Sequence, residues 1–372
     1  MQPLAGIHVL DFSTLLPGPL ASLLLAEAGA EVIKIERPGM GDEMRTYEPR
    51  LGADSANFAL LNRGKGSVAI DLKAPDALAQ LTPLLKQADV LIEQFRPGVM
   101  ERLGLGYHAV RAINDQIIYC SITGFGQHGP RHGMAGHDLN YLALTGLLSF
   151  VADKDGTPSL PPALIADIAA GGYPAVINIL LALMQRRSTG QGSHLDISMT
   201  DNLFVLAYWG LANGFAAGRW PRPGAELVTG GSPRYQIYRT ADGDYLSAAP
   251  IEQRFWDVFC RLIGLDERFH DDRLNPAKVI EAVAACIFAR PTDHWRRVFA
   301  NEDACCAVVA SLAEAVEDAH FRAHNLFGRQ TGTGTMRIPA LPLPLADAFR
   351  DTVLTKLSPT LGADNRLIAT EA

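Results

Sequence analysis

The sequence has few cysteines and no excess of positive charge, and each absence excludes a class of protein. Its five cysteines are odd in number and form no Cys-x-x-Cys pair, so we expect a reducing compartment rather than a disulfide framework. The formal net charge of -7 argues against non-specific binding to nucleic acid or to an anionic membrane. It does not exclude a local basic pocket for a phosphorylated ligand.

Long apolar runs are also scarce. The longest extends from Ala175 to Met184 and is shorter than a bilayer-spanning helix requires. The N-terminus lacks a basic segment, and Asp11 interrupts its first apolar run, which is not typical of a secretory signal. We therefore expect a cytoplasmic protein with no membrane partner. The length of 372 residues favours one large or two moderate domains.

Short segments rich in valine and isoleucine alternate with helical patterns in the first half of the chain. The segments predicted as strands are 6–12, 31–36, 67–72, 90–95, 117–122 and 193–199. Helical patterns cover residues 19–30 and 74–88. Continuous apolar strands separated by helices are typical of an α/β fold whose parallel sheet is buried on both faces.

The second half differs in composition. A Pro/Gly-rich segment precedes residues 234–249, which predict a β-hairpin with its turn at 241–243, and helical patterns follow from Ile251 to about Asn301. A hairpin followed by helices indicates a smaller α+β domain. We predict a large domain of residues 1–215 and 332–372, a linker of residues 216–229, and a small domain of residues 230–331.

Two patterns that often mark a cofactor or a metal lack their required context. The segment GFGQHG (124–129) matches the dinucleotide-binding fingerprint, but Pro130 follows where the phosphate-binding helix should begin. His128, His132 and His137 lie in a Gly/Pro-rich loop, and no second His or Cys cluster complements them. We therefore expect neither a nicotinamide cofactor nor a metal.

Basic residues recur at the ends of predicted strands. Arg37 and Arg96 each follow a strand directly, and Lys73 lies at the end of another. Ligands of an open parallel sheet bind beyond the carboxyl ends of its strands, so Arg37 and Arg96 are predicted to lie where a phosphate-bearing ligand would bind. Arg63 and Lys65 precede their strand, and only a folded-back loop would bring them near. For any one of these residues, solvated surface charge is the commoner role.

Four residues in helix-start or strand-end positions are candidates for proton chemistry. Asp138 is predicted to cap the helical pattern that follows it, and His137 then projects into the mouth of the sheet. Asp167 begins another helical pattern about thirty residues later, and Glu252 follows a strand of the small domain. Taken singly, each acid is more often a helix cap or a surface residue.

Together, segments along nearly the whole chain resemble the class III CoA-transferase superfamily. They are DFSTLLPGPLASLLLAEAGAEVIKIERPG, NRGKGSVAIDLK, FRPGVMERLGLGY, SITGFGQHGP, AGHDLNYLALTG, GQGSHLDISM, GGSPRYQIYRTADGDYLS and, with a weaker match, LSPTLGADN. Within it, the chain is most similar to the α-methylacyl-CoA racemases. These carry a GHD-x-N-Y segment, an aspartate about thirty residues on, and an Ile-Glu pair after the hairpin of the second domain. The matching residues here are His137, Asp167 and Glu252.

The resemblance implies a large Rossmann-like domain, a small domain and an interlocked homodimer. His137 and Asp167 would come from one chain and Glu252 from its partner. It implies an acyl-CoA substrate of lipid metabolism and no cofactor other than the CoA that the substrate carries. The residues implied to contact CoA are Arg37, Ile70, Asp71, Leu72, Lys73, Arg96, Gly136, Asn140 and Tyr141.

The implied reaction inverts the α-carbon of a 2-methyl-branched acyl-CoA through an enolate, which requires two bases on opposite faces of that carbon. Neutral His137 removes a proton on one face, and protonated Asp167 delivers one on the other. Glu252 would orient the imidazole ring. The backbone N–H of Asp138 would stabilise the enolate oxygen.

An alternative reaction uses the same fold and the same aspartate. In CoA-transferases of this superfamily, the residue matching Asp167 is a nucleophile that forms an acyl anhydride. Those enzymes tend to have Tyr or Phe at the position of His137, and several glycines where this chain has only GGS (230–232). A third alternative, a non-catalytic acyl-CoA-binding protein, has no reason to retain His137, Asp167 and Glu252 together. The identity of the acyl group is not encoded in any recognisable motif.

Overall fold

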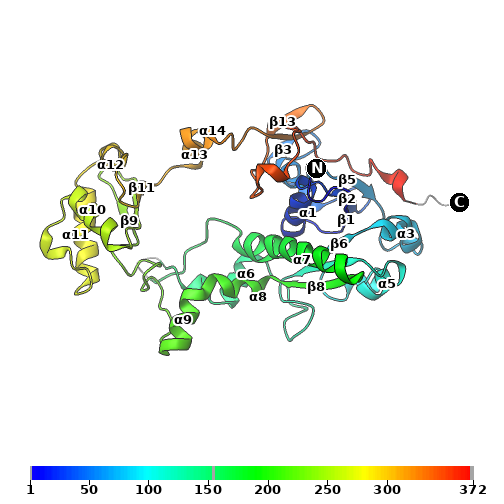
Figure 1. Cartoon of the computed structure of the whole chain (residues 1–372), viewed down its shortest axis with the longest axis horizontal. Helices are drawn as coiled ribbons and strands as arrows, with labels where there is room; N and C mark the ends of the chain where they lie inside the picture. The colour runs from blue at the N-terminus through cyan, green and yellow to red at the C-terminus, as the bar shows by residue number, and fades with distance from the viewer. Residues whose placement is uncertain (1, 153–155, 369–372) are drawn as a thin grey trace. The chain divides into compact units, whose positions relative to one another are not determined.

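The computed structural model describes residues 2–152 and 156–368, which group into two compact units (Figure 1). The first unit comprises Met1–Thr145, Pro162–Val205 and Arg322–Ala372, and the second comprises Gly146–Pro161 and Leu206–Phe321. These limits differ from the predicted ones in three places. Residues 146–161 and 206–215, predicted in the large domain, group with the second unit, and residues 322–331, predicted in the small domain, group with the first.

The first unit is built on a six-stranded parallel sheet, as the alternation of strands and helices predicts. Its strands, in spatial order, are β5 (Gly66–Ala69), β2 (Glu31–Glu36), β1 (His8–Asp11), β6 (Val90–Glu93), β7 (Ile118–Thr123) and β8 (Ser193–Ser198). All five pairings are parallel, and all six predicted strands are confirmed. The order reverses between β1 and β6, which is the point where sheets of this type open a crevice for a ligand.

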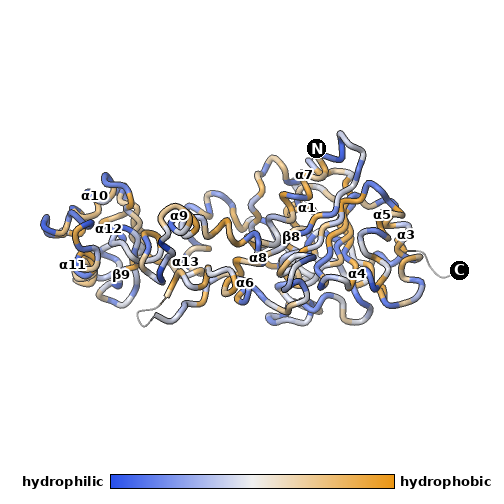
Figure 2. The backbone as a smooth tube through the Cα atoms, turned by 90° about the horizontal axis from the view of Figure 1, so that it is seen from below, coloured by the Kyte–Doolittle hydropathy of each residue, from blue (hydrophilic) through white to orange (hydrophobic). Residues whose placement is uncertain are grey.

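Apolar residues on both faces of the sheet form the core of this unit. Every residue of β6 and β7 is buried, as is every residue of α1 (Pro17–Glu27). Helix α1 therefore has no polar face: it packs between the sheet and the helices α2 (Ala56–Asn62) and α7 (Tyr173–Thr189). The hydropathy of the backbone trace shows the same apolar segments running through the unit (Figure 2).

Further helices and two short strand pairs complete the first unit. They are α3 (Ala77–Gln87), α4 (Val99–Arg102), α5 (Tyr107–Ile113), α6 (Asp138–Leu144), α8 (Met199–Leu203), and the two-stranded pairs β3 (Arg50–Leu51) with β4 (Asp54–Ser55) and β12 (Gln330–Thr333) with β13 (Met336–Pro339). The C-terminal segment lies along the outer edge of β5. There the backbone N–H of Asp364 donates to Ser67 O at 2.9 Å, and Asn365 Oδ1 accepts the N–H of Ala69 at 2.8 Å.

Helix α7 continues a preceding turn without a break, so one helix extends over Ala166–Thr189. By length and composition alone it is long and apolar enough to cross a membrane, although the apolar run noted in the sequence is shorter. Its buried face, including Ile179, packs against α1 and against β7 and β8, whereas Leu181 and Met184 are exposed. A single helix of this kind is weak support for a membrane span.

The second unit contains the predicted hairpin. Strands β9 (Gln236–Arg239) and β10 (Tyr245–Ala248) pair antiparallel, which confirms it, and β11 (Cys306–Val308) pairs with β10. The helices are α9 (Tyr208–Ala217), α10 (Gln253–Ile263), α11 (Pro276–Phe288), α12 (Thr292–Phe299) and α13 (Leu312–Glu317), with α14 (Ala319–Ala323) at the boundary of the unit. Aromatic side chains, among them Trp256, Phe259 and Trp295, fill its core.

Candidate active site

Two cavities open along the carboxyl edge of the sheet, one on each side of the point where the strand order reverses. The first, of about 350 Å³, is lined by residues at the ends of β5, β2, β1 and β6. The second, of about 410 Å³, is lined by residues that follow β1, β6, β7 and β8, together with residues of α6. Phe95, which follows β6, lines both cavities. A ligand long enough to occupy both would therefore pass over the crevice between β1 and β6.

The predicted binding residues divide between these two cavities. Those lining the first are Arg37, Ile70, Asp71, Leu72 and Lys73. Those lining the second are Arg96, Gly136, Asn140 and Tyr141, and His137 and Asp167 line it with them. The structure thus brings the two predicted bases into one cavity and several of the predicted CoA contacts into its neighbour.

Arg63 and Lys65 are not at either cavity. Both are buried: Arg63 Nε donates to Glu27 Oε1 at 2.8 Å, and Lys65 Nζ lies 3.2 Å from Asp11 Oδ2. The loop before β5 does not fold back over the carboxyl edge, and the two cations instead neutralise buried carboxylates. Their role is in the core of the unit.

The turn that carries His137 is fixed by Tyr141. The Tyr141 hydroxyl donates to Gly136 O at 2.6 Å. A Cβ at Gly136 or Gly124 would lie within 2.7 Å or 2.6 Å of the Tyr141 ring, so both positions require glycine. The backbone N–H of His137 donates to Asn140 Oδ1 at 3.0 Å, which further orders the start of α6. These contacts hold the exposed His137 at the wall of the second cavity.

The prediction that Asp138 caps α6 is wrong. His137 occupies the N-cap position with an extended backbone, and Asp138 is the first residue of the helix. The side chain of Asn140 already satisfies the N–H of His137, and Asp138 turns inward. Its buried Oδ1 accepts the backbone N–H of Asp167 at 3.0 Å. Asp138 therefore ties the element that carries one candidate base to the element that carries the other.

Asp167 lies on a short π-helical segment, Ala166–Gly172, that leads into α7. Such wide turns interrupt regular helices at functional sites more often than elsewhere. The small residues of this segment make room for neighbouring protein atoms, not for a ligand. A Cβ at Gly171 would lie 3.0 Å from Pro17 Cβ and 3.0 Å from Met199 Sδ. The tight packing sets where the Asp167 carboxyl meets the cavity.

The surroundings of Asp167 favour its protonated form. Burial and, to a smaller extent, the nearby charge of Asp138 raise the pKa of its carboxyl to about 6, and His137 opposes both effects. A group with a pKa near the working pH can both donate and accept a proton. The cavity therefore holds two groups, an imidazole and a tuned carboxyl, that can exchange protons with a bound ligand.

Replacing Asp138 with asparagine should lower the pKa of Asp167, because the substitution removes a negative charge that raises it. The asparagine amide oxygen can still accept the Asp167 N–H, so the backbone geometry is retained. We would measure the pKa by NMR titration of protein labelled with ¹³C at the aspartate carboxyls. Asp115→Asn, on the exposed opposite edge of the sheet, should leave it unchanged. An unchanged or higher value in Asp138→Asn would refute this electrostatic account.

Comparison with known proteins identifies the family. The model of CoA-transferase family III matches residues 4–365. The chain belongs to CoA-transferase family III. It is 36% identical over 328 residues to human α-methylacyl-CoA racemase, covering 87% of this chain and 82% of that protein. It is 31% identical over 352 residues to acetyl-CoA:oxalate CoA-transferase from Acetobacter aceti, covering 92% and 89%.

A solved structure supports the assignment of the fold. A CAIB/BAIF family protein from Brucella suis superimposes with a TM-score of 0.84 and 29% identity over 98% of both chains. Curated relatives in CoA-transferase family III include both racemases and CoA-transferases. The family is therefore one of enzymes, and their names imply acyl-CoA substrates.

Within this family III chain, Glu252 belongs to a different compact unit from the other candidates. It occupies the N-cap position of α10, directly after the hairpin, as its place in the sequence indicates. His137 and Asp167 belong to the first unit. The predicted role of Glu252 beside the imidazole ring stays a prediction.

Several residues that line the two cavities were not among the site residues predicted from the sequence. They are Phe12, Thr14, Leu15, Pro17, Gln94, Phe95 and His132. Most lie in the loops after β1 and β6, which the strand order places next to each other. Strand order depends on the long-range winding of the chain, so no local sequence pattern indicates that these two loops are neighbours. In the part of the chain that the structure describes, no group of three or more His, Cys, Asp or Glu side chains could hold a metal ion.

Proposed function

We propose that this protein is a racemase or epimerase that inverts the α-carbon of 2-methyl-branched acyl-CoA thioesters. The observation that carries the proposal is that His137 and Asp167 line one cavity, and that burial raises the pKa of Asp167 to about 6. Two proton-transfer groups at one ligand are what a two-base inversion requires. A CoA-transferase needs only one of them.

The reaction proceeds by two proton transfers. Neutral His137 takes the α-proton, the electron pair of the C–H bond passes into the C–C bond of an enolate, and the thioester oxygen gains the negative charge. Asp167, present as the carboxylic acid, then gives its proton to the opposite face of the α-carbon, and the carbonyl re-forms. His137 is left protonated and Asp167 ionised, which is the starting state for the opposite enantiomer.

The enolate oxygen needs a hydrogen-bond donor that is already in place. We assign this role to the backbone N–H of Asp138, which follows His137 directly and begins α6. The buried contact between Asp138 Oδ1 and the Asp167 N–H supports the assignment, because it limits movement between donor and acid. Glu252 would orient the imidazole ring and stabilise its protonated form.

The CoA part of the substrate would occupy the first cavity. Arg37 and Lys73 line it and supply positive charge for phosphate groups. Arg37 Nε donates to Gly41 O at 3.1 Å, which orders its guanidinium at the rim. The chain of the ligand would pass Phe95 toward the second cavity, so that binding energy from CoA positions the reacting carbon. No further cofactor is needed for this chemistry.

We also propose that the enzyme is a cytoplasmic homodimer in which Glu252 comes from the second copy. This part of the proposal rests on the family resemblance alone. Its direct consequence is that His137 and Glu252 belong to different chains. Mixed dimers of His137→Ala and Glu252→Ala chains would then contain one intact site.

A second candidate function is CoA transfer between carboxylic acids. It is favoured by relatives such as the acetyl-CoA:oxalate CoA-transferase, which match this chain over most of its length. Asp167 would then attack the thioester carbonyl, and CoA would leave as the thiolate while an acyl anhydride forms. This reaction gives His137 no role, although His137 shares the cavity with Asp167.

One experiment separates the candidates. The purified protein is incubated with one enantiomer of a 2-methylacyl-CoA in D₂O, with no acceptor acid, and the α-carbon is followed by mass spectrometry. We expect one deuterium per molecule and a loss of optical purity. Absence of deuterium across several acyl chains, with CoA passing to an added carboxylate, would instead establish transfer. Binding of acyl-CoA with neither reaction would indicate a non-catalytic protein.

A further inference from the structure

The loop between β1 and α1 separates the two cavities. Thr14 lines the first, whereas Leu15 and Pro17 line the second. The backbone of Leu15 has φ +63°, in the left-handed region that residues with a Cβ rarely adopt. Such a conformation persists only where surrounding contacts impose it, and it recurs where a loop must meet a ligand.

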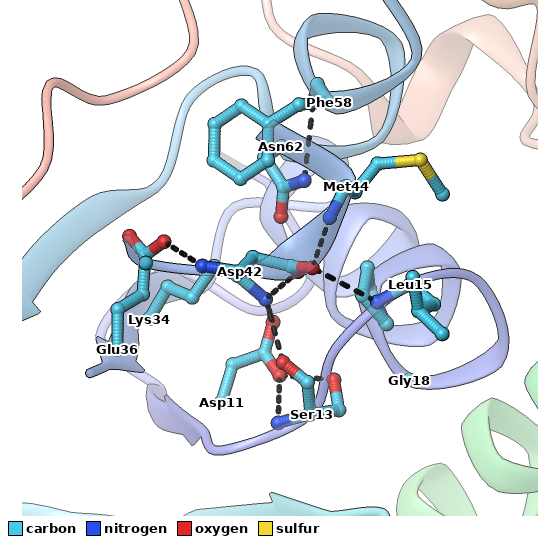
Figure 3. A network of polar contacts seen from close by, with 12 residues as sticks. Asp11, Ser13, Leu15, Gly18, Lys34, Glu36, Asp42, Met44, Phe58 and Asn62 are labelled. Atoms are coloured by element: carbon cyan, nitrogen blue, oxygen red, sulfur yellow. Dashed lines mark hydrogen bonds and ion pairs between the residues drawn. The ribbon is translucent and has the colours of Figure 1, made fainter. Parts of the chain in front are cut away.

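Three buried charged residues impose this conformation. Asp11, Lys34 and Asp42, here called the charge cluster, lie close together beside this loop (Figure 3). Their side chains have 0% exposure. Asp42 Oδ1 accepts the N–H of Leu15 at 3.2 Å, and Asp42 Oδ2 lies 2.9 Å from Lys34 Nζ. Lys34 Nζ also donates to Ser13 O at 2.6 Å, and Asp11 Oδ1 accepts the N–H of Ser13 at 3.0 Å. The cluster thus binds the loop backbone at residues 13 and 15.

Asp11 and Lys34 are held charged by their neighbours. Burial alone would raise the pKa of Asp11, but Lys34 and Lys65 outweigh it and hold that pKa well below its usual range. Burial likewise opposes the charge of Lys34, yet Asp11 and Asp42 raise its pKa. Replacing buried ion pairs by apolar residues often costs a fold nothing. Stability is therefore a weak reason for burying charges at this place, and their contacts with the loop backbone indicate a second one.

The first turn of α1 leaves the loop no room to relax. A Cβ at Gly18 would lie 2.2 Å from Ser13 Cβ, so the helix and the loop are in direct contact at this point. The N–H of Gly18 donates to Gln94 Oε1 at 3.0 Å, and Gln94 lines the second cavity. The loop is therefore clamped between the charge cluster on one side and α1 with the β6 loop on the other.

We propose that Asp42 and Lys34 are positioning residues for catalysis: they hold the β1–α1 loop so that Leu15 forms the wall of the acyl site beside Asp167. The inference rests on the proposed function, because it requires a thioester that extends through both cavities. A shift of the loop would move the reacting carbon relative to Asp167, and small displacements of this kind cost catalysis more than binding. Loss of Asp42 should therefore lower kcat more than it weakens the affinity for CoA.

A comparison of glycine and alanine at position 15 tests this directly. Glycine adopts the left-handed conformation without help, whereas alanine retains the Cβ that opposes it. Both remove the leucine side chain, so alanine is the matched control. We expect Asp42→Ala to lower the deuterium-exchange kcat by about 10- to 100-fold in the wild-type and Leu15→Ala backgrounds. In the Leu15→Gly background, the same change should cost only a few-fold.

Equal losses in the glycine and alanine backgrounds would overturn the inference, because Asp42 would then act without regard to the conformation of residue 15. Asn325, a second left-handed residue outside both cavities, supplies a control pair. Asn325→Gly and Asn325→Ala should leave the effect of Asp42→Ala unchanged. If Asp42→Ala does not fold, Asp42→Asn, which keeps an oxygen acceptor, carries the same comparison with smaller losses.

Failure of the proposed function gives a different result from failure of the positioning inference. It appears as an absence of exchange in the wild-type protein, whatever position 15 contains. Calorimetric titration with CoA gives a readout that needs no turnover. Asp42 is among the residues that line the first cavity, but its side chain has 0% exposure, so the CoA affinity should change by no more than a few-fold in Asp42→Ala. A CoA affinity that falls in parallel with kcat would mean that the cluster supports only the fold of the binding site, and would overturn the positioning role.

Discussion

Asp167→Asn should abolish inversion while leaving solvent exchange for one enantiomer. Asparagine retains the shape of the side chain and the backbone N–H that donates to Asp138, so the fold is preserved. It cannot carry the proton that inversion requires, and loss of a general acid or base typically costs 10²- to 10⁴-fold. His137 is exposed, so the proton that it captures exchanges with D₂O. The imidazole then returns a deuteron to the same face of the α-carbon. We therefore expect deuterium without racemisation, for a single enantiomer.

Chiral chromatography combined with mass spectrometry measures inversion and exchange in one sample. Asp115→Asn, a change of an exposed carboxylate at the far edge of the sheet, should retain wild-type rates. Inversion within about twofold of wild type in Asp167→Asn would remove Asp167 from the mechanism. A covalent acyl adduct on Asp167 that hydroxylamine traps in the wild-type protein would support the transferase reaction instead.

His137→Ala should give the reciprocal result. Inversion should fall by about 10²- to 10⁴-fold, because the second base is lost. Any remaining exchange should belong to the opposite enantiomer, whose proton faces Asp167. The imidazole is exposed and takes part in a capping box with Asn140 at the start of α6, so the free energy of unfolding should fall by about 1 kcal/mol. The contacts proposed for CoA in the first cavity are untouched, and CoA affinity should stay within a few-fold of wild type.

His132→Ala is the matched control, since this second imidazole lines the same cavity. It should leave inversion close to the wild-type rate. The most informative contrary outcome is a His137→Ala protein that moves CoA to an added carboxylate at the wild-type rate. That result would mean that Asp167 is a nucleophile and that His137 has no role in the reaction.

The six strands could be predicted because each carries a local signal of valine and isoleucine, with a helix or a turn between most of them. Their order could not. The neighbours β1 and β6 are separated by β2 and β5 in the sequence, and only the winding of the chain brings them together. For this reason the sequence did not predict that Phe95 and Leu15 line the cavities, although both lie in segments that resemble the family.

The candidate site was predicted in its residues more than in its geometry. The grouping of His137 with Asp167 came from the family resemblance, since thirty residues and a turn separate them. The error at Asp138 has a local cause: a helix begins where the backbone changes conformation, and here Asn140 reaches back to His137. The burial of the Lys34 charge could not be predicted, because its partner Asp42 belongs to a loop that follows the strand.

The contact between β5 and the C-terminal segment bears on how the chain is made. Ser67 and Asp364 are hydrogen-bonded to each other although 297 residues separate them. During synthesis, the residues of the second unit leave the ribosome before the segment that covers β5. Until then the outer strand of the sheet presents unpaired backbone groups, which can template pairing with another chain. These residues therefore cover the outer strand only after the second unit has been synthesised, and β5 stays open to pairing with another chain until then.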